Sequence, residues 1–206
     1  MAESIRPAGP LDEAVFPAWK AIEELLPRPD ALLLLGTGMG VLPATLARLE
    51  RLPLQDIAGV PAAWRQGELV AGERDGLLIW ALVDAPGPID FGEALTADEA
   101  PWVRGFPCWL ARAAGAEVLL HTSAGTGLAR HGAEPGARGG TLALVADHIN
   151  LSGTTPLRGL GPTRLGPLFP DTSALHDPVL RKAALEIARA RGIAVVEGVV
   201  ACTLAP

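Results

Sequence analysis

The chain has 206 residues, of which 49% are apolar and 19% are charged, a composition typical of one soluble globular domain, here residues 1–206. The net charge of −6 excludes a protein whose main partner is nucleic acid, because no surplus of Lys and Arg exists to contact phosphates. No apolar run is long enough to span a bilayer, and no signal peptide is visible, so we expect a cytoplasmic protein without a membrane partner.

Helical and strand patterns alternate along the first half of the chain. Apolar residues recur at helical spacing over 11–26, where Pro17 is tolerable only near the start of a helix. The runs 31–35 and 77–83 are apolar on both faces, as in strands covered by helices. Residues 41–49 return to helical spacing, which predicts the order strand, glycine loop, helix.

The same alternation continues in the second half of the chain. The pattern predicts a helix over 99–115 and strands over 118–122, 141–148 and 193–204. A further helix is predicted over 177–191, because Asp-Pro precedes it and Gly follows it. Strands therefore alternate with helices throughout, so the fold class is α/β with a central mixed, largely parallel sheet.

Two loops of small residues follow buried strands. One is Gly-Thr-Gly-Met-Gly at 36–40, and the other is Ser-Ala-Gly-Thr-Gly at 123–127. Open α/β sheets bind ligands beyond the carboxyl ends of their strands, and glycines let backbone N–H groups approach an anion. We therefore expect Gly36 and Ser123 to lie side by side in one binding crevice. Either loop alone is equally consistent with a tight turn. The spacing excludes a Walker-type loop and disfavours a dinucleotide site.

The remaining polar and aromatic residues form no recognisable catalytic arrangement. The histidines lack metal-ligand spacing, and Ser123 has no adjacent nucleophile motif, so we expect no metal and no nucleophilic catalysis. His148 beside Asp147 is either a pH-sensitive pair or, as we favour, a hydrogen-bonded anchor between a strand end and a loop. We expect buried, reduced cysteines and tryptophans in the core or at subunit contacts: Cys108, Cys202, Trp64, Trp80, Trp102 and Trp109.

Residues 144–159 read Leu-Val-Ala-Asp-His-Ile-Asn-Leu-Ser-Gly-Thr-Thr-Pro-Leu-Arg-Gly. The blocks Asp-His-Ile-Asn-Leu and Pro-Leu-Arg-Gly resemble those of the trimeric purine nucleoside phosphorylases and their methylthioadenosine-cleaving relatives. Residues 36–40 resemble the family's Gly-Ser-Gly-Leu-Gly phosphate loop, and 122–128 resemble its Thr-Asn-Ala-Ala-Gly-Gly-Leu segment. Phe-Pro-Asp at 169–171 and Glu-Gly at 197–198 also match family motifs.

The resemblance implies a phosphorylase-type three-layer fold with helices on both sides of the sheet. It also implies phosphate-dependent cleavage of the N-glycosidic bond of purine nucleosides, with inorganic phosphate as co-substrate and no other cofactor. The partners would be a purine nucleoside, phosphate and further copies of the chain in a homo-oligomer, a trimer as in the family. The implied phosphate-binding residues are Thr37, Gly38, Ala124 and Arg65, and the implied nucleoside-binding residues are Ser123 and Gly125.

Three departures from the family pattern leave the activity open. Residues 86–99, at the family's Gly-Arg-x-His-x-Tyr-Glu-Gly motif, contain no Arg, His or Tyr. Arg65 stands at a second family histidine, where it either restores positive charge or is a solvated residue near Glu68. The chain ends at the family's Gly-Pro-Ser-Phe-Glu motif, so we expect the purine-binding segment beyond it to be absent. The alternatives are a catalytically silent homologue that binds an anion, a nucleoside or a partner subunit, and a structural protein without a site.

Overall fold

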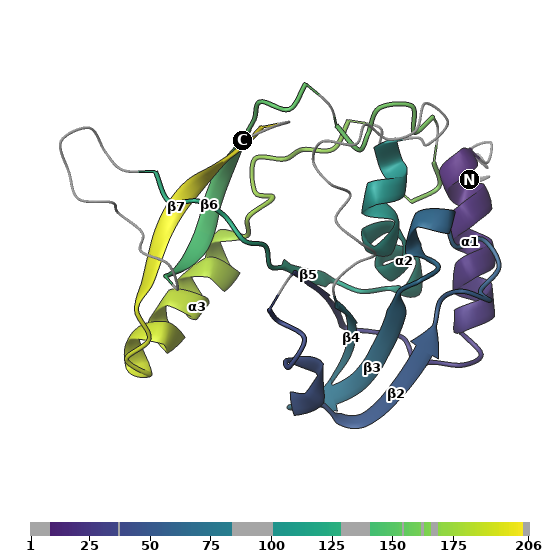
Figure 1. Ribbon diagram of the computed structural model, residues 1–206, viewed down its shortest axis with the longest axis horizontal. Helices are drawn as coiled ribbons and strands as arrows, with labels where there is room; N and C mark the ends of the chain where they lie inside the picture. The colour runs from purple at the N-terminus through teal and green to yellow at the C-terminus, as the bar shows by residue number, and fades with distance from the viewer. Residues whose placement is uncertain are drawn as a thin grey trace, which may run out of the picture. The chain divides into compact units, whose positions relative to one another are not determined.

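The computed structural model describes residues 9–36, 38–83, 101–128, 141–153, 155–161, 163–165 and 169–203. The chain divides into two compact units, Met1–Ala124 with Thr154–Leu168, and Gly125–Gly153 with Phe169–Pro206. Each unit has a sheet of its own (Figure 1). Among the described residues, no helix has both the length and the apolar character needed to cross a membrane.

The first unit contains a five-stranded mixed sheet in the order β2-β3-β4-β1-β5 (Figure 1). β1 runs parallel to its neighbours β4 and β5, whereas β3 is antiparallel to both β2 and β4. The α/β class and the mixed sheet are therefore as predicted, and the strands expected near 31–35, 77–83 and 118–122 are confirmed. The last of these was expected to be buried, but β5 is exposed because it lies at the edge of the sheet. The bounds are β1 Ala31–Leu35, β2 Ala47–Pro53, β3 Glu68–Arg74, β4 Leu77–Val83 and β5 Val118–His121.

Helices α1 (Pro10–Ile22) and α2 (Phe106–Ala114) pack against each other and cover one face of this sheet. The opposite face carries a small cluster of Leu35, Val70 and Ala81. Helices were expected on both sides, but the described helices of this unit share one side. The four tryptophans predicted in the core or at subunit contacts are core residues, because Trp64, Trp80 and Trp102 belong to the main cluster and Trp109 packs against it. The cluster also includes Leu11, Val15, Ile22, Leu32, Leu69, Leu82, Phe106 and Leu110.

Residues 41–49 do not form the predicted helix. A short 3-10 turn, η1 (Pro43–Thr45), leads directly into β2. β2 docks closely on β3 because Gly72 has no side chain: a Cβ there would lie 2.8 Å from Leu46 Cβ and 3.0 Å from the carbonyl oxygen of Ala47. Pairing with β3 therefore overrides the helical spacing of this segment.

Two helices differ in detail from their predicted forms. Pro17 lies in the middle of α1 instead of near its start. Both Pro17 and Glu13 are exposed, so the helical carbonyl that loses its donor is accessible to water. The helix predicted over 99–115 is a 3-10 segment, η3 (Pro101–Gly105), followed by α2. Gly115, with a φ of 101°, ends α2 in the left-handed conformation.

The second unit contains the parallel pair β6 (Leu142–Asn150) and β7 (Val195–Cys202), with α3 (Pro178–Ala190) between them in the chain. These strands were predicted in the central sheet, whereas here they pair only with each other. The start of α3 is as predicted, because the Asp177 carboxylate accepts the N–H groups of Val179 and Leu180, each at 2.8 Å.

His148 links β6 to the segment before α3. Its Nδ1 lies 3.2 Å from Nε2 of His176, and its backbone N–H donates to Oδ1 of Asp147 at 2.8 Å. This is the hydrogen-bonded anchor between a strand end and a loop that the sequence predicts.

Both cysteines are free thiols. Cys108 is half-buried on α2, and burial raises the pKa of its thiol, so it stays protonated at neutral pH. Cys202 is exposed, which corrects the prediction that both are buried. The reason is its position at the end of β7, a strand of a two-stranded sheet whose side chains are mostly exposed.

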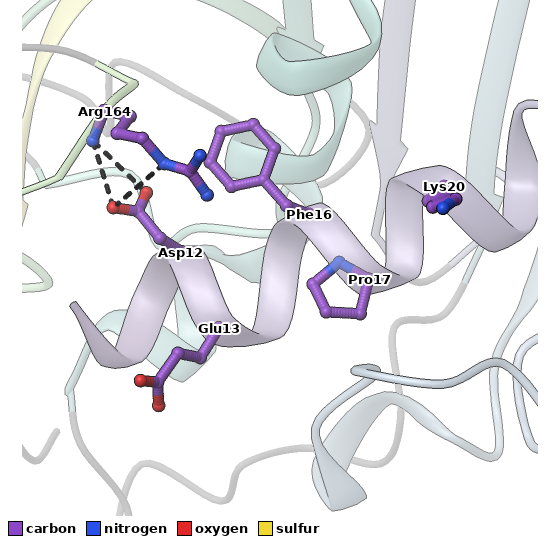
Figure 2. A pocket seen from close by; sticks show the side chains of 6 residues that line it. All are labelled: Asp12, Glu13, Phe16, Pro17, Lys20 and Arg164. Atoms are coloured by element: carbon purple, nitrogen blue, oxygen red, sulfur yellow. Dashed lines mark hydrogen bonds and ion pairs between the residues drawn. The ribbon is translucent and has the colours of Figure 1, made fainter. Parts of the chain in front are cut away.

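A buried carboxylate joins α1 to residues 163–165 (Figure 2). Asp12 is 1% exposed, and accepts the Thr163 hydroxyl at 2.9 Å and the Arg164 backbone N–H at 3.1 and 3.2 Å. The guanidinium carbon of Arg164 lies 4.1 Å from the ring centre of Phe16, and Figure 2 shows the two side chains next to each other. Because this segment follows the Pro-Leu-Arg-Gly block, the carboxylate holds that part of the chain on α1.

Replacing Asp12 by alanine should lower the free energy of unfolding by about 2–4 kcal/mol, because the Thr163 hydroxyl and the N–H groups of Gly9 and Arg164 lose a charged acceptor. Urea denaturation of Asp12→Ala measures this change. The control is Glu13→Ala, an exposed neighbour on the same helix turn, which we expect to stay within about 0.5 kcal/mol of the parent. Equal losses in the two variants would contradict a structural role for Asp12.

Candidate functional site

The loops that follow β1 and β5 meet at the carboxyl ends of these strands. The register pairs Leu34 with His121, and the N–H of Thr122 donates to the Leu34 carbonyl at 3.0 Å, one residue beyond β5. The hydroxyl of Thr122 then accepts the N–H of Gly36 at 2.9 Å. Gly36 and Ser123 are therefore neighbours, as the sequence predicts.

Glycine is required at position 36 because two backbones touch there. A Cβ on Gly36 would lie 2.6 Å from the carbonyl oxygen of Thr122 and 3.3 Å from the Cα of Ser123. The carbonyl of Gly36 accepts the N–H of Met39 at 3.1 Å, and Gly38 has a φ of 87°. The first loop therefore turns back immediately after β1, in a conformation that favours glycine.

Backbone N–H groups are the donors available at this edge of the sheet. Within the described residues, the N–H groups of Gly38, Ser123 and Ala124 have no hydrogen-bond partner. A Cβ on Gly38 would meet no atom within 4 Å, so the backbone there is open to a ligand. The donors come from turns and not from the predicted helix N-terminus, because a 3-10 turn and β2 replace that helix. Such exposed N–H groups are suited to a small anion.

The other predicted site residues have different outcomes. Thr37 lies outside the described residues, as does the segment 86–99 where the family has its phosphate arginine. Gly125 is the first residue of the second unit. The roles assigned to Thr37 and Gly125 therefore stay predictions.

Arg65 lies in the turn before β3, at the same edge of the sheet, because β3 runs antiparallel to β4. Its Nε donates to the carbonyl of Val60 at 3.1 Å. Glu68, the acidic residue near it in the sequence, instead pairs with Arg51 at 2.5 Å. In the part of the chain that the structure describes, no hydrogen bond or ion pair joins Arg65 to either loop, and a phosphate-binding role for it stays a prediction.

Two residues next to the loops were not singled out by sequence reasoning. Thr122 makes the bond that joins the loops; its signal was the threonine that opens the family's Thr-Asn-Ala-Ala-Gly-Gly-Leu segment. His121 precedes it at the end of β5. Partial burial of the imidazole lowers the pKa of His121, so the ring is neutral at pH 7 and adds no positive charge to this edge.

Known proteins share both the sequence pattern and the fold. The family model of the phosphorylase superfamily matches residues 105–206. Purine nucleoside phosphorylase 1 of Geobacillus stearothermophilus is 32% identical over 197 residues, which cover 94% of this chain and 68% of the relative. The chain belongs to the purine nucleoside phosphorylase family. Purine nucleoside phosphorylase 1 of Bacillus subtilis (strain 168) is 31% identical over 189 residues, covering 90% of this chain and 65% of the relative.

Solved structures of the family have the same fold. Schistosoma mansoni purine nucleoside phosphorylase with a monocyclic inhibitor superposes with a TM-score of 0.80 at 23% identity, covering 97% of this chain and 73% of that one. Isoform 2 from the same organism, with cytosine and ribose-1-phosphate, has a TM-score of 0.75 at 27% identity, covering 98% and 70%. The chain thus spans 65–68% of the two bacterial relatives, and is purine nucleoside phosphorylase-like over that length.

Gly36→Ala should separate the two loops, because its Cβ would overlap the Thr122 carbonyl. We expect a loss of about 1–3 kcal/mol in unfolding free energy, typical of overpacking, and weaker phosphate binding by calorimetry. Gly105→Ala is the matched control, since its Cβ would meet its nearest neighbour at an ordinary 3.5 Å. Unchanged stability and phosphate affinity in Gly36→Ala would contradict the described approach of the loops.

Proposed function

We propose that this protein catalyses the phosphate-dependent cleavage of purine nucleosides. An oxygen of inorganic phosphate attacks the anomeric carbon while the C–N bond breaks, and the leaving purine takes up the proton that the phosphate loses. The products are pentose 1-phosphate and the neutral free purine. The observation that carries the proposal is the joined pair of loops at Gly36 and Thr122, with N–H groups at Gly38 and Ala124 that have no partner among the described residues. Phosphate is the co-substrate, and no other cofactor takes part.

The chemistry suits a site made of fixed backbone donors. Such a reaction needs the phosphate held in line with the bond that breaks, and it needs stabilisation of the charge that develops. N–H groups in short turns that begin at the end of a strand ladder need little reorganisation when the anion binds. Family membership supports the same reaction, and the S. mansoni isoform 2 structure contains ribose-1-phosphate, the kind of product expected here.

A second candidate function is a catalytically silent homologue that binds phosphate or a nucleoside. Residues 86–99 contain no Arg, His or Tyr, although the resemblance places the phosphate arginine there. Arg65 has its Nε bonded to Val60, and His121 is neutral at pH 7. An anion site with little positive charge favours weak binding over efficient turnover.

An assay of phosphorolysis separates the two candidates. Inosine, guanosine and methylthioadenosine are incubated with excess phosphate, and release of the free base is followed. Base release that requires phosphate supports the enzyme. Phosphate binding by calorimetry without base release supports the silent homologue. If neither phosphate nor any of these nucleosides raises the melting temperature, both candidates are contradicted.

Two substitutions test the predicted phosphate ligands. Thr37→Val should weaken phosphate binding by about 1–3 kcal/mol, the effect of losing one donor to a charged acceptor. Arg65→Ala should weaken it further and make the affinity less sensitive to salt, since a charge is lost. Calorimetry at two ionic strengths measures both effects. Arg28→Ala, an exposed arginine before the amino end of β1, should bind phosphate like the parent.

We also propose that the protein assembles into trimers, as the resemblance implies. Large apolar side chains of the second unit are exposed, among them Ile149 at 52%, Ile187 at 55% and Val199 at 59%. Closed symmetric oligomers are a common way to cover such residues. Sedimentation at micromolar concentration should give a mass of three 21.3 kDa chains. A monomer under these conditions would overturn this proposal.

A further inference from the structure

We propose that Thr122 is a positioning residue for phosphate, which acts by holding the N–H of Gly36. Its hydroxyl would keep the loops after β1 and β5 in one arrangement, so that their free N–H groups face the same anion. This inference rests on the phosphate site proposed above. It assigns a role to a residue that lies in the segment resembling the family but is not among the predicted ligands.

The first argument is the place where the strand ladder ends. The N–H of Thr122 makes the last backbone hydrogen bond between the β1 and β5 segments, to the carbonyl of Leu34 at 3.0 Å. The carbonyl of Gly36 is turned toward Met39, so it no longer faces the neighbouring chain as a ladder acceptor. The N–H of Gly36 would be left without a partner at this point, and a half-buried side chain, the Thr122 hydroxyl, accepts it at 2.9 Å.

The second argument is that the backbone of Gly36 is tightly constrained. Both backbone groups of Gly36 are engaged, the N–H by Thr122 and the C=O by Met39. The space between the chains is too small for a Cβ, which would lie 2.6 Å from the Thr122 carbonyl. The start of the first loop is therefore held on three sides, and its position depends on the Thr122 side chain.

The third argument is where the free donors lie. The N–H of Gly38 is two residues beyond Gly36, and the N–H of Ala124 is two residues beyond Thr122. Because each donor is only two residues from the anchored residue, a shift of Gly36 or Thr122 is expected to move the donor as well. Removing the hydroxyl therefore displaces phosphate donors that Thr122 itself does not provide.

The experiment compares Thr122→Val, which keeps the branched shape without an acceptor, with Thr122→Ser, which keeps the hydroxyl. Thr45→Val is the control, because the Thr45 hydroxyl donates to the Leu42 carbonyl and accepts from Nη1 of Arg74, and so does not hold the N–H of Gly36. We measure phosphate affinity by calorimetry, KM for phosphate and for inosine, and hydrogen exchange of the Gly36 amide. Thr122→Ala is a second variant without an acceptor, in case valine is too large to fold in this site.

We expect Thr122→Val and Thr122→Ala to weaken phosphate binding by about tenfold, the loss of one hydrogen bond. The KM for phosphate should rise by a similar factor, and exchange of the Gly36 amide should become faster. Thr122→Ser and Thr45→Val should behave like the parent. Rescue by serine distinguishes positioning from general destabilisation.

Three results would overturn the inference: phosphate affinity unchanged in the variants without an acceptor, serine no better than valine, or a parent protein that binds no phosphate at millimolar ligand. A parent that binds phosphate but releases no base would overturn the proposed activity alone. In that case, a tenfold loss of phosphate binding in Thr122→Val would still support the role of Thr122.

Discussion

The position of β1 between β4 and β5, parallel to both, is the constraint on which the candidate site depends. Parallel strands bring their carboxyl ends to the same edge, so the loops at Gly36 and Ser123 meet although 86 residues separate Gly36 from Thr122. The ladder between β1 and β5 ends in a hydrogen bond from the Gly36 N–H to the Thr122 hydroxyl. The backbone N–H groups proposed to bind phosphate lie directly beyond this bond.

The site relies on backbone dipoles more than on charged side chains. In the part of the chain that the structure describes, the N–H groups of Gly38 and Ala124 have no partner, whereas Arg65 is bonded at Nε to the Val60 carbonyl and His121 is neutral at pH 7. Fixed dipoles orient an anion well, but they attract it less strongly than a bidentate arginine does. Phosphate binding and nucleoside cleavage therefore have to be measured separately for this member of the family.

Far from the loops, α1 has two functions in the first unit. Its apolar side packs on the sheet and α2, and Asp12 accepts hydrogen bonds from Thr163 and Arg164. A buried carboxylate is stabilised only when donors surround it, so the segment after the Pro-Leu-Arg-Gly block is bound to α1 at one defined place. The sequence near residue 12 contains no sign of this contact, because its partner lies 151 residues away.

Several features followed from the sequence alone. The strands at 31–35 and 77–83 are apolar on both faces, Asp177 caps α3, and the motifs near 36–40, 122–128 and 144–159 identified the family. Local patterns are sufficient there because burial on both faces, capping and motif residues are properties of short segments. The adjacency of the two loops was also predictable, since it follows from a parallel sheet.

Tertiary contacts decided the rest. Residues 41–49 have helical spacing but form a turn and a strand, because the bare backbone of Gly72 lets β2 dock on β3. β6 and β7 pair in a sheet of their own, and Cys202 is exposed at its end. The bond from Gly36 to Thr122 joins residues far apart in the chain at a distance of 2.9 Å. Such contacts depend on the fold as a whole, because the free energy of pairing distant segments exceeds the preference of either segment alone.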